Sequence, residues 1–169
     1  SCRQLPRAGI MPRVSTYDAV QICGATSIIA SLIALGHDVD FILQLYRKHV
    51  PTVMSQKTAP ARSQALKNLA SEVFGDTTFS DVKTGVGIVT AKWLTERPMI
   101  FKGSVAQAHG RVGTFVPGFG VSIADAVKAS CSAYPFFERT IVRTSMGEDV
   151  ELIDGGYCAN NPTLYAIAD

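Results

Sequence analysis

The stretch VELIDGGYCANNP, residues 150–162, decides the fold class, because it joins a predicted strand to a predicted helix through a turn that carries a carboxylate. Residues 150–153 are mostly apolar and follow a hairpin-like turn, which is typical of a strand. Asp154-Gly155-Gly156 predicts a tight turn, in which the two glycines permit positive φ and let the backbone approach a ligand closely. Asn161-Pro162 predicts the N-cap and first residue of a helix.

Working outward from this stretch, the apolar pattern predicts strands that alternate with helices. A short strand at residues 19–23 enters a small-residue turn and then a helix over residues 28–35. A second helix begins with Asp38 as its N-cap and ends before Pro51. Further elements are predicted as a helix over residues 63–75, strands over residues 87–93 and 98–102, a glycine-rich loop over residues 103–120, a helix capped by Ser122 and Asp125, and a hairpin of residues 141–142 and 150–153. The alternation predicts an α/β sandwich around a mainly parallel sheet.

The composition predicts one globular domain and excludes several classes of protein. With 169 residues, of which 47% are hydrophobic and 18% charged, the chain suits a single core and is far from disorder. Its net charge of +2 comes without a run of lysine or arginine, which argues against a nucleic-acid polymer as partner. The chain starts at Ser1 without a methionine and stops at Asp169 inside a predicted helix. We therefore expect residues 1–169 to form a single, incomplete domain.

Cysteine spacing and hydropathy indicate the compartment. The cysteines lie far apart, with no CxxC or Cys/His pair, which predicts free thiols in a reducing compartment rather than a metal site or a disulfide scaffold; they are Cys2, Cys23, Cys131 and Cys158. No apolar run reaches the roughly 18 residues of a membrane-spanning helix, and no signal peptide opens the chain. We therefore expect a cytoplasmic protein.

Three segments, taken in order, resemble the patatin-like phospholipase family. Residues 27–46 resemble the helix behind the family's nucleophile and the helix after it. Residues 126–137 (AVKASCSAYPFF) and 154–162 (DGGYCANNP) resemble the family's Ala-Ser helix end and its Asp-Gly-Gly segment. The resemblance implies a three-layer αβα sandwich with a mainly parallel central sheet. It also implies a serine–aspartate dyad without a histidine, an oxyanion held by amides of a glycine-rich loop, and no metal or cofactor.

Asp154 is the catalytic base that this resemblance implies. A serine hydroxyl is a weak nucleophile that an adjacent base must activate. An aspartate with an ordinary pKa of about 4 is a poor base at neutral pH, so its surroundings must be partly apolar to raise the pKa. An Asp-Gly pair after a strand is first of all a turn. The flanking residues 160–162 and the upstream Ala-Ser segment favour catalysis.

The family's nucleophile motif, G-x-S-x-G, is absent from this sequence, so the sequence can be aligned with that motif in two ways. Aligned from Ile28 without a gap, the serine position falls on Gly24, and the protein has no nucleophile. Aligned from the left, Ser27 is the nucleophile, and Gly24 belongs with Gly155 and Gly156 to the oxyanion and turn positions. We favour Ser27, because helix N-terminal amides stabilise a developing anion, although a helix N-cap explains Ser27 equally well. The chain is then either a degenerate member or one with residues missing near the oxyanion loop, and we favour missing residues.

The expected function is a lipid acyl hydrolase that releases fatty acids from membrane phospholipids through Ser27 and Asp154. Such an enzyme would be cytoplasmic and would lie peripherally at the membrane surface when active. A narrower resemblance, carried by residues 129–135 and 160–162, is to bacterial antiphage defence phospholipases that a cyclic nucleotide activates; a homo-oligomer is compatible with it. The alternatives are a catalytically degenerate scaffold that binds lipid or nucleotide, and an α/β domain with another acyl-transfer role.

Overall fold

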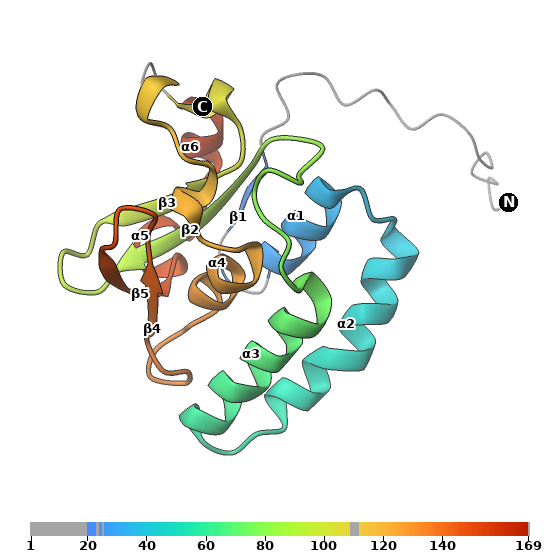
Figure 1. Cartoon of the computed structure of the whole chain (residues 1–169). Coiled ribbons are helices and arrows are strands. Elements are labelled where there is room, and N and C mark those ends of the chain that lie inside the picture. The colour runs from blue at the N-terminus through green and yellow to red at the C-terminus, as the bar shows by residue number, and fades with distance from the viewer. Residues whose placement is uncertain (1–19, 23, 25, 109–111, 169) are drawn as a thin grey trace, which may run out of the picture.

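The computed structural model describes residues 20–22, 24, 26–108 and 112–168, which form one sheet covered by helices (Figure 1). The strands are β1 (Val20–Ile22), β2 (Val86–Lys92), β3 (Pro98–Lys102), β4 (Thr140–Arg143) and β5 (Asp149–Asp154). The helices are α1 (Thr26–Leu35), α2 (Val39–Met54), α3 (Ala59–Phe74), α4 (Ile123–Ser130), α5 (Gly156–Ala159) and α6 (Thr163–Ala168). The α/β class predicted from the sequence is thus confirmed, and α5 is an element that the pattern did not predict.

The prediction of a mainly parallel sheet is wrong for the described strands. Only β1 and β2 run parallel, whereas β2–β3, β2–β5 and β4–β5 are antiparallel. The reason is the length of the connections: helices separate β1 from β2, but turns of a few residues join β2 to β3 and β4 to β5. A parallel pair needs a crossover of a dozen residues or more, so these short turns allow only hairpins.

Strand β2 brings the ends of β1 and β5 together. Its residues 87–91 pair with β3 along one edge, so its other partners lie on the opposite edge. There β1 pairs with residues 86–88 in parallel, and β5 pairs with residues 90–92 in the antiparallel direction. The two strands therefore run toward each other along one edge, and their carboxyl ends face each other across Val89.

The largest differences from the predicted helix boundaries are at the end of α2 and the start of α3. Helix α2 is capped by Asp38, whose carboxylate accepts a hydrogen bond from the Phe41 amide at 2.8 Å, but it continues through Pro51 to Met54. A proline removes one backbone donor, yet the final turn still closes through a bond from the Ser55 amide to the Pro51 carbonyl. Helix α3 begins four residues before Ser63, because Thr58 caps it and a proline occupies its first turn.

The core lies between the sheet and the helices. Helix α4 packs on β2, β4 and β5, α3 packs on α4, and α2 lies against α3 on the side away from the sheet (Figure 1). Leu32, Ile88, Phe101, Ile123 and Leu152 are among its largest fully buried side chains. The predicted loop over residues 103–120 contains short 3₁₀ turns. Within the described ranges, no helix is both long and apolar enough to cross a membrane.

Candidate active site

Asp154 ends strand β5 and presents its carboxylate at the meeting point of β1 and β5. The Gly156 amide donates a hydrogen bond to Oδ1 at 2.7 Å, and the backbone amide of Asp154 donates to the Ser132 carbonyl at 3.0 Å. The side chain is partly buried, and burial raises the pKa of Asp154, while the hydrogen bond from Gly156 opposes part of that rise. A carboxylate with a raised pKa is better suited to act as a general base.

Gly24 faces this carboxylate. It lies in the short connection between β1 and α1, and its φ of +63° is in the left-handed region. A Cβ atom built on Gly24 would lie 3.3 Å from Asp154 Oδ2 and 3.7 Å from Oδ1. The structure therefore brings together Gly24 and Asp154, two of the residues that the sequence analysis selected.

Ser27, the preferred nucleophile, lies elsewhere in the first turn of α1. Its side chain is fully buried, and its Oγ lies 3.5 Å from the Cys131 sulfur. No hydrogen bond joins Ser27 to Asp154, although both residues belong to the described part of the chain. The Ser27 amide donates to the Gly24 carbonyl at 2.9 Å, so Ser27 closes the first helical turn. The catalytic role of Ser27 stays a prediction that this geometry does not support.

The last residue of α4 and the two residues after it hold both sides of the site. This segment, Ser130-Cys131-Ser132, is called the α4 turn below. The Gly24 amide donates to the Ser130 carbonyl at 3.2 Å, and the Cys131 sulfur lies 3.2 Å from the Gly24 carbonyl. Ser132 accepts the bond from Asp154 described above. These residues carry part of the family resemblance, but no sequence pattern indicates their contacts with Gly24, which lies 107 positions before Cys131.

A hydroxyl of the α4 turn also fills the gap between β1 and β5. The fully buried Ser130 donates its hydroxyl to the Val89 carbonyl at 2.8 Å. Val86 and Lys92 of β2 form backbone hydrogen bonds with Gly103 and Arg97, the residues that flank β3, so by alternation the carbonyl of Val89 points to the opposite edge of β2. Ser130 thus satisfies a backbone group that neither β1 nor β5 pairs in register.

Of the two glycines after Asp154, Gly156 acts through its small size. Gly155 has a φ of −62°, and Gly156 is not among the positive-φ glycines. The expected use of positive φ at these positions is therefore wrong. A Cβ on Gly156 would lie 3.2 Å from Asp154 Oδ1, so the missing side chain lets the amide of residue 156 approach the carboxylate.

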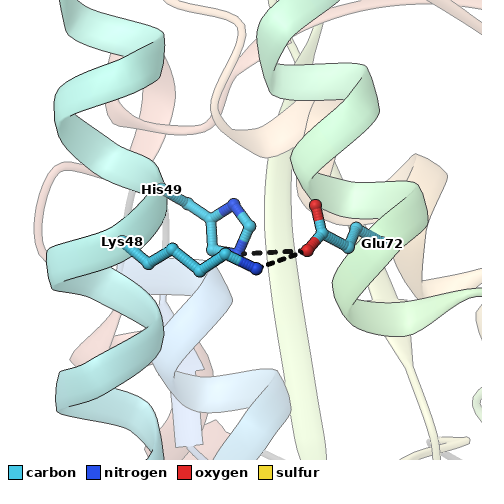
Figure 2. A network of polar contacts seen from close by, with 3 residues as sticks. All are labelled: Lys48, His49 and Glu72. Atoms are coloured by element: carbon cyan, nitrogen blue, oxygen red, sulfur yellow. Dashed lines mark hydrogen bonds and ion pairs between the residues drawn. The ribbon is translucent and has the colours of Figure 1, made fainter.

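A second polar feature lies between α2 and α3, away from this site. A hollow of about 420 Å³ is lined by residues of these two helices and of their connection, and by none of β5 or the α4 turn. At its rim Glu72 accepts a hydrogen bond from Lys48 at 2.7 Å and lies 3.7 Å from His49 Nε2 (Figure 2). The bond from Lys48 lowers the pKa of Glu72. In the described ranges, no three His, Cys, Asp or Glu side chains gather as metal ligands would.

Comparisons with known proteins agree with the resemblance found in the sequence. Residues 22–167 match the patatin-like phospholipase family. A cUMP-AMP-activated phospholipase of Escherichia coli is 65% identical over 158 residues, which cover 94% of this chain. The chain spans about half the length of this curated relative, 49% of it. Because the family match covers most of the sequence, the chain belongs to the patatin-like phospholipase family.

Proposed function

We propose that this protein is a lipid acyl hydrolase that releases fatty acids from membrane phospholipids, with Asp154 as the general base. The observation that carries the proposal is the half-buried carboxylate of Asp154, which sits at a strand end against the turn that opens α1. Burial raises the pKa of this carboxyl group, as a base for serine activation requires. Membership of the family and the relative's name support phospholipid as the substrate.

The same proposal includes control by a cyclic dinucleotide. The relative from Escherichia coli is named for its activation by cUMP-AMP, and the identity of 65% supports a similar activator here. Such a ligand acts by shifting the population toward a competent site. The protein would be cytoplasmic, would act peripherally at the membrane surface as an antiphage effector, and would work alone or as a homo-oligomer. The compartment, the membrane contact and the oligomeric state follow from the family resemblance of the sequence, and so does a three-layer αβα arrangement, which is part of the same proposal.

A second candidate function is a scaffold that binds lipid or nucleotide without hydrolysis. The position of Gly24, whose Cβ direction points at the Asp154 carboxylate, favours it, because a glycine supplies no hydroxyl to that carboxylate. Ser27 is the alternative source of a nucleophile, but its hydroxyl contacts Cys131 instead. The two functions share the fold and differ only in whether an acyl–enzyme forms.

A fatty-acid release assay tests the proposal. The intact protein is mixed with phosphatidylglycerol–phosphatidylethanolamine vesicles, with and without cUMP-AMP, and free fatty acid is measured. The proposal expects release that depends on cUMP-AMP and that Asp154→Asn abolishes. Asp149→Asn is the matched control, since it changes an exposed aspartate on the same strand. Vesicle binding without release, unchanged in Asp154→Asn, would support the scaffold instead.

A further inference from the structure

A partly exposed group of aromatic and apolar side chains borders the candidate active site. Its members come from the turn between β2 and β3, from the segment between the α4 turn and β4, and from α5. They are called the aromatic rim below: Trp93, Leu94, Tyr134, Phe136 and Tyr157. Tyr157 follows Asp154 by three residues, and Tyr134 follows by two the residue whose carbonyl accepts the bond from the Asp154 amide. The rim therefore lies beside the carboxylate.

Three rings of the rim hold one another in place at the surface. Trp93 and Tyr134 meet edge to face, with ring centroids 5.4 Å apart. The Tyr157 hydroxyl donates a hydrogen bond to the Tyr134 carbonyl. The guanidinium carbon of Arg139 lies 4.8 Å from the centroid of the Trp93 ring and 5.8 Å from that of the Tyr134 ring. Tertiary contacts thus fix these rings, although segments far apart in the sequence supply them.

Two apolar side chains extend the rim into solvent. Leu94 is 85% exposed and directly follows Trp93, and Phe136 is 66% exposed on the same short segment as Tyr134. Single exposed apolar residues are ordinary, whereas a group of them around a polar site marks an interaction surface. We therefore expect a partner to cover the rim when the protein works.

The chemistry of the rim indicates a phospholipid bilayer as this partner. Tryptophan and tyrosine have an apolar body and a polar tip, so they favour the boundary between headgroups and acyl chains. A phospholipid carries its ester bonds at this same boundary, so an acyl hydrolase must present the border of its active site to the bilayer. The charged residues around the rim balance in sign, which gives no preference for a strongly charged protein partner. They are Lys92, Arg97, Arg139, Glu96, Glu138 and Glu151, the last of which pairs with Arg139 at 3.2 Å.

We propose that the aromatic rim is the surface through which this protein docks on a phospholipid bilayer, with Leu94 and Phe136 at the acyl-chain boundary and the three rings at the level of the headgroups. The inference rests on the proposed acyl-hydrolase function, which requires a bilayer beside Asp154. It adds the residues that meet the lipid and the force that holds them there. Because the surrounding charges balance, burial of apolar surface drives the docking rather than attraction to anionic headgroups.

The fluorescence of Trp93 tests the docking directly, since the 169 residues contain one tryptophan. The intact protein, with and without cUMP-AMP, is titrated with phosphatidylglycerol–phosphatidylethanolamine vesicles whose acyl chains carry bromine. Trp93→Phe supplies the blank. The emission of Trp93 should move to shorter wavelength and be quenched by bromine, and phosphatidylcholine vesicles should act in the same way. Raising the salt concentration from about 0.1 M to about 0.5 M should weaken binding less than about threefold.

Negative charges placed in the rim should prevent docking. Leu94→Glu combined with Phe136→Glu should raise the lipid concentration for half-maximal binding in a vesicle flotation assay about 10-fold or more, since a carboxylate resists leaving water. Met146→Glu is the matched control. Met146 is 84% exposed in the turn that precedes β5, at the end of that strand away from Asp154, and this variant should bind as the unmodified protein does. Thermal melts verify that the variants fold.

The outcomes separate this inference from the proposed function. Vesicle binding without a change in Trp93 emission, or equal binding by the double variant and Met146→Glu, would overturn the inference, and the hydrolase proposal would stand if fatty acid is released. No vesicle binding under either condition would also overturn the inference. Quenching of Trp93, with no fatty acid released by the unmodified protein, would support the docking surface and contradict hydrolysis. If the double variant does not fold, quenching in the unmodified protein still decides.

Discussion

The hydroxyl of Ser130 offers a sensitive test of how the site is held together. Ser130→Ala removes the donor to the Val89 carbonyl at the gap between β1 and β5, at a position with no solvent exposure. The bond from the Gly24 amide to the Ser130 carbonyl is a backbone bond and survives the change. The substitution therefore isolates one buried hydrogen bond.

The expected loss of stability follows from the cost of a buried carbonyl without a partner. Leaving such a group unsatisfied costs about 1–3 kcal/mol, more than the net gain from an average hydrogen bond. Water cannot replace the donor cheaply, because Val89 and Ser130 are both fully buried. For a chain of this length each kcal/mol lowers the melting temperature by about 2–4 °C, so a fall of about 2–12 °C is expected.

Urea denaturation followed by far-ultraviolet circular dichroism, together with a thermal melt, measures this effect. Ser71→Ala is the matched control, since Ser71 lies exposed on α3 and its replacement should change the free energy of unfolding by less than about 0.5 kcal/mol. The reasoning is refuted if Ser130→Ala destabilises the protein no more than Ser71→Ala does.

Three further predictions concern charge and packing. Because burial raises the pKa of Asp154, the native state holds its proton to a higher pH than the unfolded state does, so stability falls as the pH rises through that range. Asp154→Asn should therefore raise the free energy of unfolding at neutral pH, and the difference from the unmodified protein should vanish below the ordinary aspartate pKa of about 4. Urea denaturation at pH values from roughly 3 to 8 measures this difference. Equal free energies of unfolding at the upper end of that pH range would contradict the prediction. Leu32→Ala, at a fully buried position of α1, should cost about 2–5 kcal/mol in the same assay, against less than about 0.5 kcal/mol for the exposed Leu94→Ala. Glu72→Gln should change the free energy of unfolding no more than Leu94→Ala does, since the side chains of Lys48 and Glu72 are 67% and 57% exposed. A larger loss would show that the contacts in Figure 2 do more than a surface ion pair.

Local signals in the sequence predicted most of the elements. Asp38 and Ser122 cap their helices through bonds to amides three residues on, so a short window contains all the information needed. The pairing of the strands was not accessible in the same way. The pattern of strands and helices suggested parallel neighbours, whereas the short turns before β3 and β5 impose hairpins.

The candidate active site, like the strands, was only partly predictable from local sequence. The residues around Asp154 identified it as the candidate base, but the sequence left two positions open for the nucleophile. Gly24 lies in the connection before α1 and Ser27 lies in its first turn, so the choice between them depends on how this segment packs against the rest of the fold. Burial of Ser27 against Cys131 turns that side chain into the core and leaves Gly24 toward Asp154.

By itself the sequence determined the family, the α/β class, the capped helices and the carboxylate that ends β5, because each is read from short local segments, even where several such segments are combined. Only the tertiary structure decided that β1 and β5 meet on one edge of β2, that the α4 turn anchors both ends, and that residue 24 faces Asp154. Those features depend on contacts between residues that lie far apart in the sequence, such as Val20 with Val86 and Gly24 with Cys131, and packing of the whole core sets them rather than local backbone preference.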